Sequence, residues 1–256
     1  MSTLLISSEG TTLTVTLDRP AQLNAMGIAE LDAIRQVFTE IAETEPTDRP
    51  RAVVVRSTGT RAFVAGADIA EMAAASSDSG ERISRAGQAA MDSIAACPVP
   101  VIAAVDGHAL GGGCELAAAC DLVYATANSL FALPEVGLGL IPCFGGTYRV
   151  AARIGDGRAR RLALTGERVT AATAEEWGLV DAVLPDADGL AAAVGGQALA
   201  FSRASRNALA AVKAAFALPA PLRAVAERTL FRDALAHADG QEGMAAFLSK
   251  RAPSFR

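Results

Sequence analysis

The chain has 256 residues, of which 51% are hydrophobic, and a formal net charge of −5. A chain of this length and composition can bury a large core in one or two globular domains, which excludes an intrinsically disordered protein. The weak and mixed charge argues against nucleic acid as the main partner, because duplex binding usually requires a basic face.

The first three quarters of the chain alternate between strand-like and helix-like segments. Residues 13–17 alternate apolar and polar side chains, as in a half-buried strand, and apolar residues recur every three or four positions from Ile28 to Ile41, as on one face of a helix. Residues 52–55 and 101–105 are apolar runs typical of strands buried on both faces. This alternation predicts an α/β fold with a mostly parallel sheet. The further predicted elements are a loop at 76–80, helices at 83–96, 148–154, 157–164 and 171–177, and strands at 121–125, 129–132 and 178–183.

The last part of the chain has a different character. From about Leu190 the sequence is rich in alanine, and its apolar spacing predicts helices at 191–205, 208–216, 222–237 and 242–250. We therefore expect two parts. Residues 1–189 form the core and carry the site, and residues 190–256 form a helical subdomain whose apolar faces meet another subunit.

The stretch from Val105 to Asp121 runs from a predicted strand through Gly111-Gly112-Gly113 into a predicted helix, with Glu115 in its first turn. Consecutive glycines let the backbone approach a ligand closely, and the first N–H groups of the helix point back toward them. The stretch is therefore predicted to present backbone donors to developing negative charge beside a proton-transfer group. It matches neither the phosphate loop of ATPases nor the dinucleotide fingerprint, and tight packing of the helix on a strand is the alternative explanation for its glycines.

A second loop also consists of small residues. Ala65-Gly66-Ala67 precede a predicted helix, and Asp68 and Glu71 have the spacing of a capping box. One backbone N–H from each of the two loops could hold a single oxygen atom, and removing one such donor typically costs roughly 3–4 kcal/mol of barrier. An ordinary turn into a helix is the alternative explanation.

Two glutamates are candidates for proton transfer. Glu115 lies in an apolar helix, and Glu135 stands alone among apolar residues. Burial would raise the pKa of each carboxyl toward the useful range, although a solvated surface charge is the commoner role of any one glutamate. Cys143 precedes a helix start, where a thiolate would be stabilised, but no histidine lies nearby in sequence, which favours an inert thiol.

The cysteines, the histidines and the hydropathy of the chain limit which metals, membranes and compartments suit the protein. The four cysteines form no CxxC pair and the two histidines have no metal-ligand spacing, so we expect reduced thiols and no metal site. No apolar run approaches the ~18 residues of a membrane span, and the N-terminus lacks a basic-then-apolar signal. We therefore expect a cytoplasmic protein with no membrane partner.

In this order, the segments resemble the enoyl-CoA hydratase/isomerase, or crotonase, family, and most of all its hydratases. The matching residues are spread over nearly the whole chain: Arg19-Pro20, Leu23-Asn24-Ala25, Phe63-Val64-Ala65-Gly66-Ala67-Asp68-Ile69, Ala109-Leu110-Gly111-Gly112-Gly113-Cys114-Glu115-Leu116, Asp121, Pro134-Glu135 with Gly139, Ile141-Pro142 with Gly145-Gly146-Thr147, Glu242-Gly243-Met244-Ala245-Ala246-Phe247-Leu248 and Lys250-Arg251.

The resemblance implies a spiral core of ββα units, followed by helices that form trimers, often paired into hexamers. It also implies an acyl-CoA thioester substrate and no metal or redox cofactor. The thioester oxygen would be held by the N–H groups of Ala67 and Gly112, Glu115 would help to activate the water that adds at C3, and Glu135 would exchange a proton at C2. The other substrate-binding residues that the resemblance implies are Ala65, Asp68, Ile69 and Cys143 and, from a neighbouring subunit, Phe231 and Lys250.

Two residues depart from the family pattern. Cys143 stands where many hydratases have glycine, so its side chain is expected to crowd the active-site water or to reshape the acyl pocket. Ala21 replaces a basic residue that often precedes the Leu-Asn-Ala segment, which removes one expected phosphate contact.

The expected reaction is reversible hydration of a 2-enoyl-CoA to a 3-hydroxyacyl-CoA. The alternatives are double-bond isomerisation, which can work with one glutamate, non-catalytic binding of an acyl-CoA, and thioester hydrolysis through Cys143. The retained pair of glutamates argues against the last two.

Overall fold

The computed structural model describes residues 4–73 and 77–255. Its strands are β1 (Leu4–Glu9), β2 (Thr12–Leu17), β3 (Ala52–Ser57), β4 (Ala62–Val64), β5 (Val101–Val105), β6 (His108–Leu110), β7 (Leu122–Thr126), β8 (Leu130–Ala132), β9 (Val169–Thr170) and β10 (Ala182–Leu184). Its α-helices are α1 (Ile28–Glu43), α2 (Ile69–Ala73), α3 (Ser77–Ala96), α4 (Gly112–Ala119), α5 (Ala151–Ile154), α6 (Asp156–Thr165), α7 (Ala171–Trp177), α8 (Ala187–Ser202), α9 (Arg206–Phe216), α10 (Ala220–Ala236) and α11 (Ala238–Leu248). Short turns of other helix types are η1 (Pro20–Gln22), η2 (Glu135–Leu138) and η3 (Gly146–Val150).

The described strands form two sheets, and the chain adds strands to both of them in turn. The larger has the order β1-β2-β3-β5-β7-β10 and the smaller the order β4-β6-β8-β9. In the pairs β3/β4, β5/β6 and β7/β8, the first strand joins the larger sheet and the second joins the smaller one. Neighbours are parallel except at β1–β2 and β8–β9. The chain therefore advances by one strand in both sheets at each step, which makes a spiral of ββα units and confirms the predicted α/β, mostly parallel architecture.

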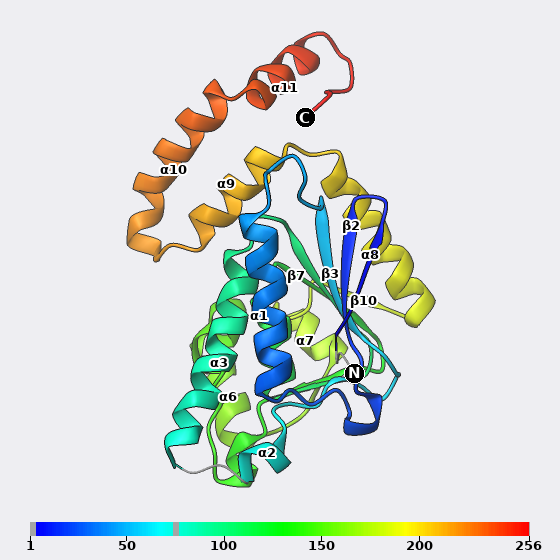
Figure 1. Cartoon of the computed structure of the whole chain (residues 1–256), viewed down its shortest axis with the longest axis vertical. Helices are drawn as coiled ribbons and strands as arrows, with labels where there is room; N and C mark the ends of the chain where they lie inside the picture. Colours follow the sequence, from blue (N-terminus) through cyan, green and yellow to red (C-terminus); the bar gives the residue numbers. More distant parts are fainter. Residues whose placement is uncertain (1–3, 74–76, 256) are drawn as a thin grey trace.

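The larger sheet is covered on both faces. Val53 and Val55 point into the main core, whereas Val54 packs with Leu190 and Val194 of α8 on the opposite face. Figure 1 shows α1 and α3 side by side on one side of the sheet and α8 on the other. Covering both faces buries residues 52–55 of β3 and most of β5, as their continuous apolar runs predicted.

The C-terminal helices are arranged in two ways. α8 packs on the sheet, so the first helix of the predicted C-terminal subdomain lies against the core. α9 leads away from it, and α10 and α11 project from the end of the molecule (Figure 1). We call α10 and α11 the arm. The division into residues 1–189 and 190–256 stays a prediction.

Three local predictions need correction. The loop predicted at 76–80 is wrong where the structure describes it, because α3 begins at Ser77, while Ser76 lies outside the described residues. Serine and glycine favour helices weakly, but extending a helix whose later turns are packed requires little further free energy. Strand β1, an edge strand with mostly exposed side chains, was not predicted. The last strand is shifted to β10, because Gly178, with φ of 88°, ends α7.

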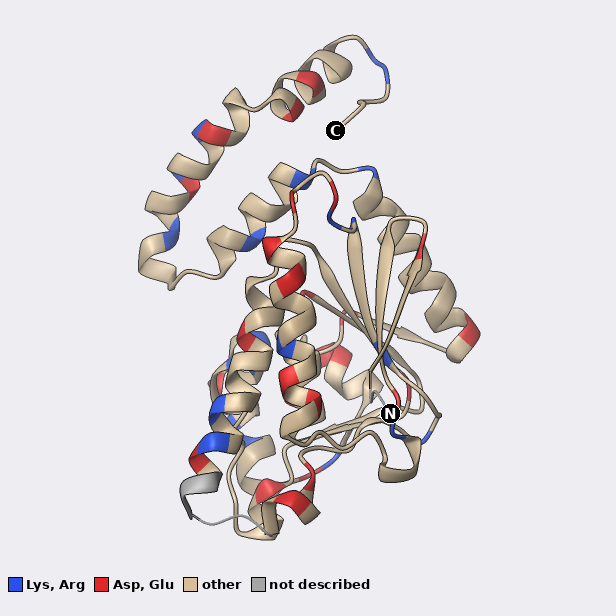
Figure 2. Ribbon diagram, in the orientation of Figure 1, with Lys and Arg blue, Asp and Glu red and all other residues tan. Residues whose placement is uncertain are grey.

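The charges and the apolar segments fit the composition. Charged residues of both signs are interspersed along α1, α3 and α10 (Figure 2). None of the described helices is long and apolar enough to cross a membrane.

Candidate active site

The glycine stretch forms a tight turn between β6 and α4. Gly111 precedes the helix with φ of 50°, in the region that favours glycine, and Glu115 follows one turn later. A Cβ on Gly113 would lie 2.1 Å from the carbonyl oxygen of Val64, so α4 rests directly on β4. Close helix–strand packing therefore explains Gly113, and the backbone turn explains Gly111.

The second small-residue loop runs beside this turn. A Cβ on Gly66 would lie 3.3 Å from the Leu110 carbonyl oxygen and 3.9 Å from the Gly112 nitrogen. Met26 donates to the Gly66 carbonyl and accepts from the Asp68 N–H, which leaves the N–H of Ala67 outside that pairing. In the described part of the chain, neither the Ala67 N–H nor the Gly112 N–H makes a hydrogen bond. The structure thus brings together the two donors that the sequence predicted.

Asp68 stabilises this loop through its side chain. Its carboxylate accepts from the N–H groups of Ala70 and Glu71 at 3.1 and 3.3 Å and pairs with Arg19 at 3.2 Å. The reciprocal half of the predicted capping box is wrong: the Glu71 carboxylate accepts from the N–H of Ile28 at 3.2 Å instead. The first N–H groups of α1 have no acceptor within the helix, and the fold brings that of Ile28 within reach of Glu71.

Glu115 is buried beneath the loop formed by residues 143–146. Glu115 is 1% exposed. Its Oε1 accepts one hydrogen bond from the N–H of Phe144, at 2.8 Å, and one from the N–H of Gly146, at 2.6 Å. Burial raises the pKa of Glu115 to about 7, the nearby charge of Glu135 adds to this, and the two N–H groups oppose it. A carboxyl with this pKa can gain or lose a proton near neutral pH.

Glu135 comes from η2 and lies against the glycine turn. A Cβ on Gly111 would be 2.7 Å from its Oε1, so a side chain at this position would force the carboxylate to shift. Its Oε2 is buried and accepts no hydrogen bond from any described residue. Burial raises the pKa of Glu135 above its ordinary value. The site therefore holds two carboxyls whose pKa values are raised above the ordinary value for glutamate.

Cys143 lies in the same loop, half-buried. Burial raises the pKa of its thiol to about 12, and the negative charges of Glu115 and Glu135 make a smaller contribution in the same direction. The helix start predicted to stabilise a thiolate is outweighed by these effects, so the inert thiol is the form that the geometry supports. The carbonyl of Cys143 accepts from Ser84 Oγ at 2.9 Å and from Gln88 Nε2 at 3.2 Å.

Sequence reasoning indicated that Phe144 shapes the pocket but did not predict its contacts in the site. Its ring is fully buried between α3 and α4: a Cβ on Gly87 would lie 1.9 Å from the ring, and one on Gly112 would lie 2.9 Å from it. No local pattern marks this contact, because Gly87 and Phe144 are far apart in the chain. Gly146 was noted only as part of a motif.

The remaining predicted residues are spread more widely. Ala65 is half-buried and donates to the Leu23 carbonyl at 3.0 Å, and Ile69 begins α2 and is 48% exposed. Phe231 is 68% exposed on α10, and Lys250 is exposed just after α11, so both belong to the projecting C-terminal part of the chain.

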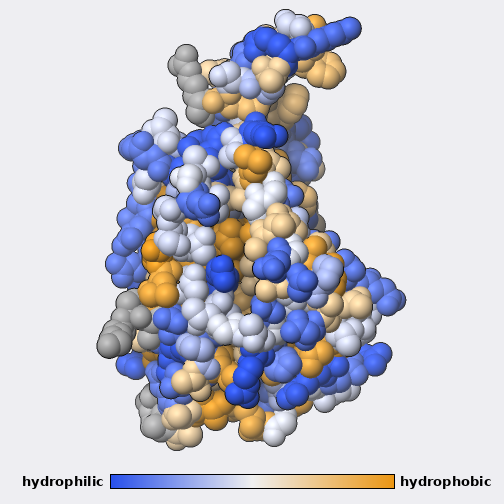
Figure 3. Space-filling model, turned by 90° about the vertical axis from the view of Figure 1, so that its right-hand side faces the viewer, coloured by the Kyte–Doolittle hydropathy of each residue, from blue (hydrophilic) through white to orange (hydrophobic). Residues whose placement is uncertain are grey.

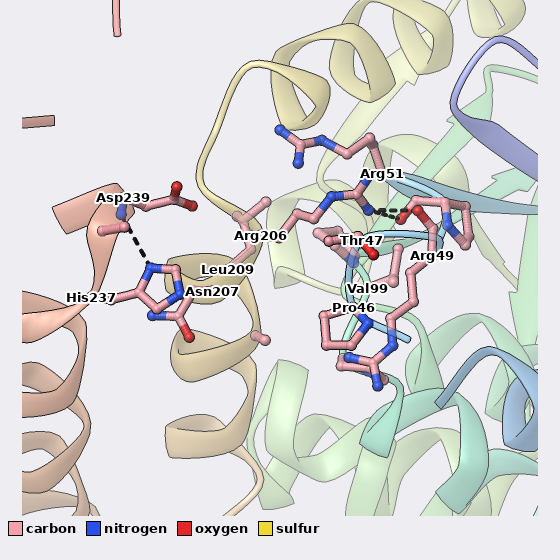
Figure 4. A pocket seen from close by; sticks show the side chains of 15 residues that line it. Pro46, Thr47, Arg49, Arg51, Val99, Arg206, Asn207, Leu209, His237 and Asp239 are labelled. Atoms are coloured by element: carbon pink, nitrogen blue, oxygen red, sulfur yellow. Dashed lines mark hydrogen bonds between the residues drawn. The ribbon is translucent and has the colours of Figure 1, made fainter. Parts of the chain in front are cut away.

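A separate pocket of about 370 Å³ lies where the 46–51 loop meets the starts of α9 and α11 (Figure 4). Its arginines are engaged by the chain itself: Arg206 donates to the Arg49 and Pro50 carbonyls, and Arg51 to those of Ser202 and Ala204. None of the residues that line it belongs to the predicted site. No group of three or more histidine, cysteine or acidic residues among those described could hold a metal ion.

The family model described as enoyl-CoA hydratase/isomerase matches residues 7–256. The chain belongs to this family. Relatives include a protein of Mycobacterium tuberculosis named "Probable enoyl-CoA hydratase", 40% identical over 99% of this chain and 97% of the relative, and the 2,3-dehydroadipyl-CoA hydratase of Escherichia coli, 40% identical over 100% and 99%.

Solved structures in this enoyl-CoA hydratase/isomerase family have the same fold. The crystal structure of an enoyl-CoA hydratase from Bacillus anthracis superposes with a TM-score of 0.92 at 30% identity, and the match covers 99% of each chain. The shared crotonase fold confirms the predicted spiral with C-terminal helices. Because the family match reaches residue 256, it includes the arm as well as the two glycine-lined loops.

Proposed function

We propose that this protein is an enoyl-CoA hydratase that adds water reversibly across the 2,3 double bond of a 2-enoyl-CoA to give a 3-hydroxyacyl-CoA, without a metal or redox cofactor. One observation carries the proposal: a buried and a half-buried carboxyl, both with raised pKa values, lie beside two backbone N–H groups that have no partner in the described chain. Family membership and relatives named as hydratases support it.

In this mechanism the N–H groups of Ala67 and Gly112 would donate to the thioester oxygen. The oxygen gains negative charge as the thioester becomes enolate-like, so both hydrogen bonds strengthen toward the transition state. Donors whose positions are already set by Met26, Asp68 and the packing of α4 need little reorganisation when the charge develops.

The two glutamates would divide the proton transfers. Glu115, in its ionised form, takes a proton from the water whose oxygen bonds to C3, and Glu135, in its protonated form, gives a proton to C2. The double bond is consumed, and exchange of one proton between the carboxyls restores the starting state. A pKa of about 7 lets Glu115 serve as a base at neutral pH, and burial shifts the pKa of Glu135 upward, in the direction that its role as an acid requires.

Hydration of crotonyl-CoA by the wild type, Glu115→Gln and Glu135→Gln tests this proposal. Each substitution removes one proton-transfer group while keeping its shape, so we expect each to lower kcat by roughly 10²–10⁴-fold. Full activity in both variants would show that the roles are wrong. Double-bond shift of a 3-enoyl-CoA without hydration would identify an isomerase, and tight CoA-ester binding without deuterium exchange at C2 would identify a binding protein.

We also propose that the protein is a homotrimer, or a hexamer made of two trimers, in which the CoA part of the substrate lies between subunits. Large apolar side chains on the C-terminal helices are exposed, among them Phe231 (68%), Phe247 (82%) and Leu248 (80%). Figure 3 shows hydrophobic residues beside hydrophilic ones on the projecting helices at the top. Exposed apolar surface of this kind marks an interaction site.

Residues from both subunits would then contact the CoA. The backbone at Ala65, Asp68 and Ile69 would bind it from one subunit, and Phe231 and Lys250 from the neighbour. We place the enzyme in the cytoplasm, a proposal supported by its four free cysteines, which suit a reducing compartment.

A further inference from the structure

The 143–146 loop has no regular secondary structure until η3 begins, yet it must hold Glu115 in a single orientation. Both hydrogen bonds to Glu115 Oε1 come from this loop, from Phe144 and Gly146. Gly145, between them, has φ of 116°, so the backbone bends sharply at this point. Something outside the loop must therefore set the direction of its N–H groups.

The contacts with α3 supply this constraint. Ser84, Gly87 and Gln88 are three and four residues apart, so they share one face of the helix. Ser84 Oγ and Gln88 Nε2 donate to the Cys143 carbonyl at 2.9 and 3.2 Å, and Gln88 Nε2 also lies 3.3 Å from Ser84 Oγ. Gly87 leaves the space that the Phe144 ring fills.

The Cys143 carbonyl and the Phe144 N–H belong to the same peptide bond. This unit is planar, with its C=O and N–H pointing in opposite directions, so a group that holds the oxygen also fixes where the N–H points. A hydrogen bond accepted by the oxygen polarises the peptide and strengthens its N–H as a donor, by roughly 10–30% per bond. A continuous chain thus runs from Ser84, through this peptide, to Glu115 Oε1.

We propose that Ser84, assisted by Gln88, is a positioning residue for Glu115: it holds the peptide between Cys143 and Phe144 in the orientation in which this peptide donates to the carboxylate. The inference rests on the proposed role of Glu115 as the base. It adds that the helix α3, which contributes no group to the reaction, sets the orientation and basicity of Glu115 through one peptide.

The groups that titrate around Glu115 limit how the proposal is tested. Glu135 from η2 and Cys143 from the loop interact with it electrostatically, as does Cys114 on its own helix. The other titratable or charged side chains that are described on elements packed against α4 are Glu81, Arg82, Arg85 and Asp92 on α3, His108 on β6, and Tyr148 and Arg149 on η3. Substituting Ser84 or Gln88 alters none of these charges.

The test is the pH profile of crotonyl-CoA hydration, from about pH 5 to about pH 9, for Ser84→Ala, Gln88→Ala and the double variant. A weaker Phe144 donor stabilises the ionised Glu115 less, so its pKa rises and the acidic limb moves to higher pH. We expect kcat on this limb to fall roughly threefold to tenfold in the double variant, with KM nearly unchanged. Ser84→Thr keeps the hydroxyl and should restore the wild-type profile.

A matched control lies on the same helix. Ser93 Oγ donates to the Ala90 carbonyl within α3, so Ser93→Ala removes a similar hydroxyl without touching the loop and should leave the profile unchanged. An unchanged acidic limb in the Ser84→Ala/Gln88→Ala variant would overturn the proposal, even if its melting temperature fell.

A second readout does not depend on turnover. Difference infrared titration of the Glu115 carboxyl, assigned with Glu115→Gln, should show a higher pKa in Ser84→Ala than in the wild type. If the wild type fails to hydrate crotonyl-CoA, the proposed function fails, but this titration still decides the role of Ser84. Identical titrations in the wild type and the double variant would refute it.

Discussion

At the scale of single residues, the decisive feature is a glutamate that the fold has almost removed from water. Oε1 of Glu115 accepts two backbone N–H groups, yet burial raises its pKa from 4.5 to about 7. Desolvation therefore outweighs the hydrogen bonds, and the carboxyl is left able to take up a proton at the pH at which most enzymes work. A better solvated glutamate would be a weaker base.

The same shift makes a prediction about stability. A pKa raised by folding means that the folded chain binds the proton more tightly, so this contribution to stability is fully present below about pH 4.5 and is lost as pH rises to about 7. Glu115→Gln carries no charge and should be the more stable protein above pH 7, by about 3 kcal/mol.

Urea unfolding of both proteins across this range measures the difference directly. It should be small near pH 4.5, should grow up to about pH 7 and should be constant above. A difference that does not vary with pH would mean that burial of the charged carboxylate is not its source.

Cys143 is predicted to be chemically silent. With a thiol pKa of about 12, only about one molecule in ten thousand carries the thiolate at pH 8. Cys143→Ser should therefore hydrate crotonyl-CoA within about threefold of the wild-type rate, and the native protein should react slowly with iodoacetamide. Loss of all turnover in Cys143→Ser would instead favour the covalent thioester hydrolysis considered from the sequence.

At the scale of elements, the position of α4 on β4 decides whether the site exists. Gly113→Ala places a Cβ 2.1 Å from the Val64 carbonyl oxygen, which belongs to the backbone and has no alternative rotamer. The helix must then move away from the strand, and we expect a loss of about 1–3 kcal/mol of stability, measured by urea unfolding.

Gly195 in α8 provides the matched control. A Cβ at this helical position meets nothing within 4 Å, so Gly195→Ala should stabilise the protein by about 0.5–1 kcal/mol. If Gly113→Ala were as stable as the wild type, the close contact between α4 and β4 would not be essential.

The elements themselves were largely predictable, for a local reason. The apolar periodicity of α1 and the apolar runs of β3 and β5 follow from how each segment is buried, so each segment's own sequence predicts its structure. Strand β1 and the first turn of α3 have no such apolar pattern, because they are stabilised by packing and pairing with other parts of the structure.

At the scale of the whole molecule, the arm carries large apolar side chains that the described chain leaves exposed. Phe247 and Leu248 are 82% and 80% exposed at the end of α11. Burying them against another subunit would give roughly 1.5–3 kcal/mol for each side chain. A free chain that exposed them would be prone to associate nonspecifically.

We therefore expect Phe247→Asp to shift the protein to species smaller than the trimer in sedimentation velocity, whereas Phe247→Leu keeps the oligomer. If the neighbour supplies Phe231 and Lys250 to the CoA, Phe247→Asp should also raise KM for crotonyl-CoA more than it lowers kcat. A wild-type protein that sediments as a monomer would remove the basis of this prediction.

From the sequence alone, the glycine-lined turn and the presence of Glu115 in the first turn of α4 were predictable, because each lies within a few neighbouring residues. The family was predictable because its short motifs follow one another in the expected order along nearly the whole chain. Tertiary structure decided the rest. Glu135 reaches Gly111, and Phe144 and Gly146 reach Glu115, across 24 to 31 residues of chain, and only the packing of the spiral brings them together. The pKa of about 7 is likewise a property of the fold, since it is the balance between burial and hydrogen bonds that no single segment contains.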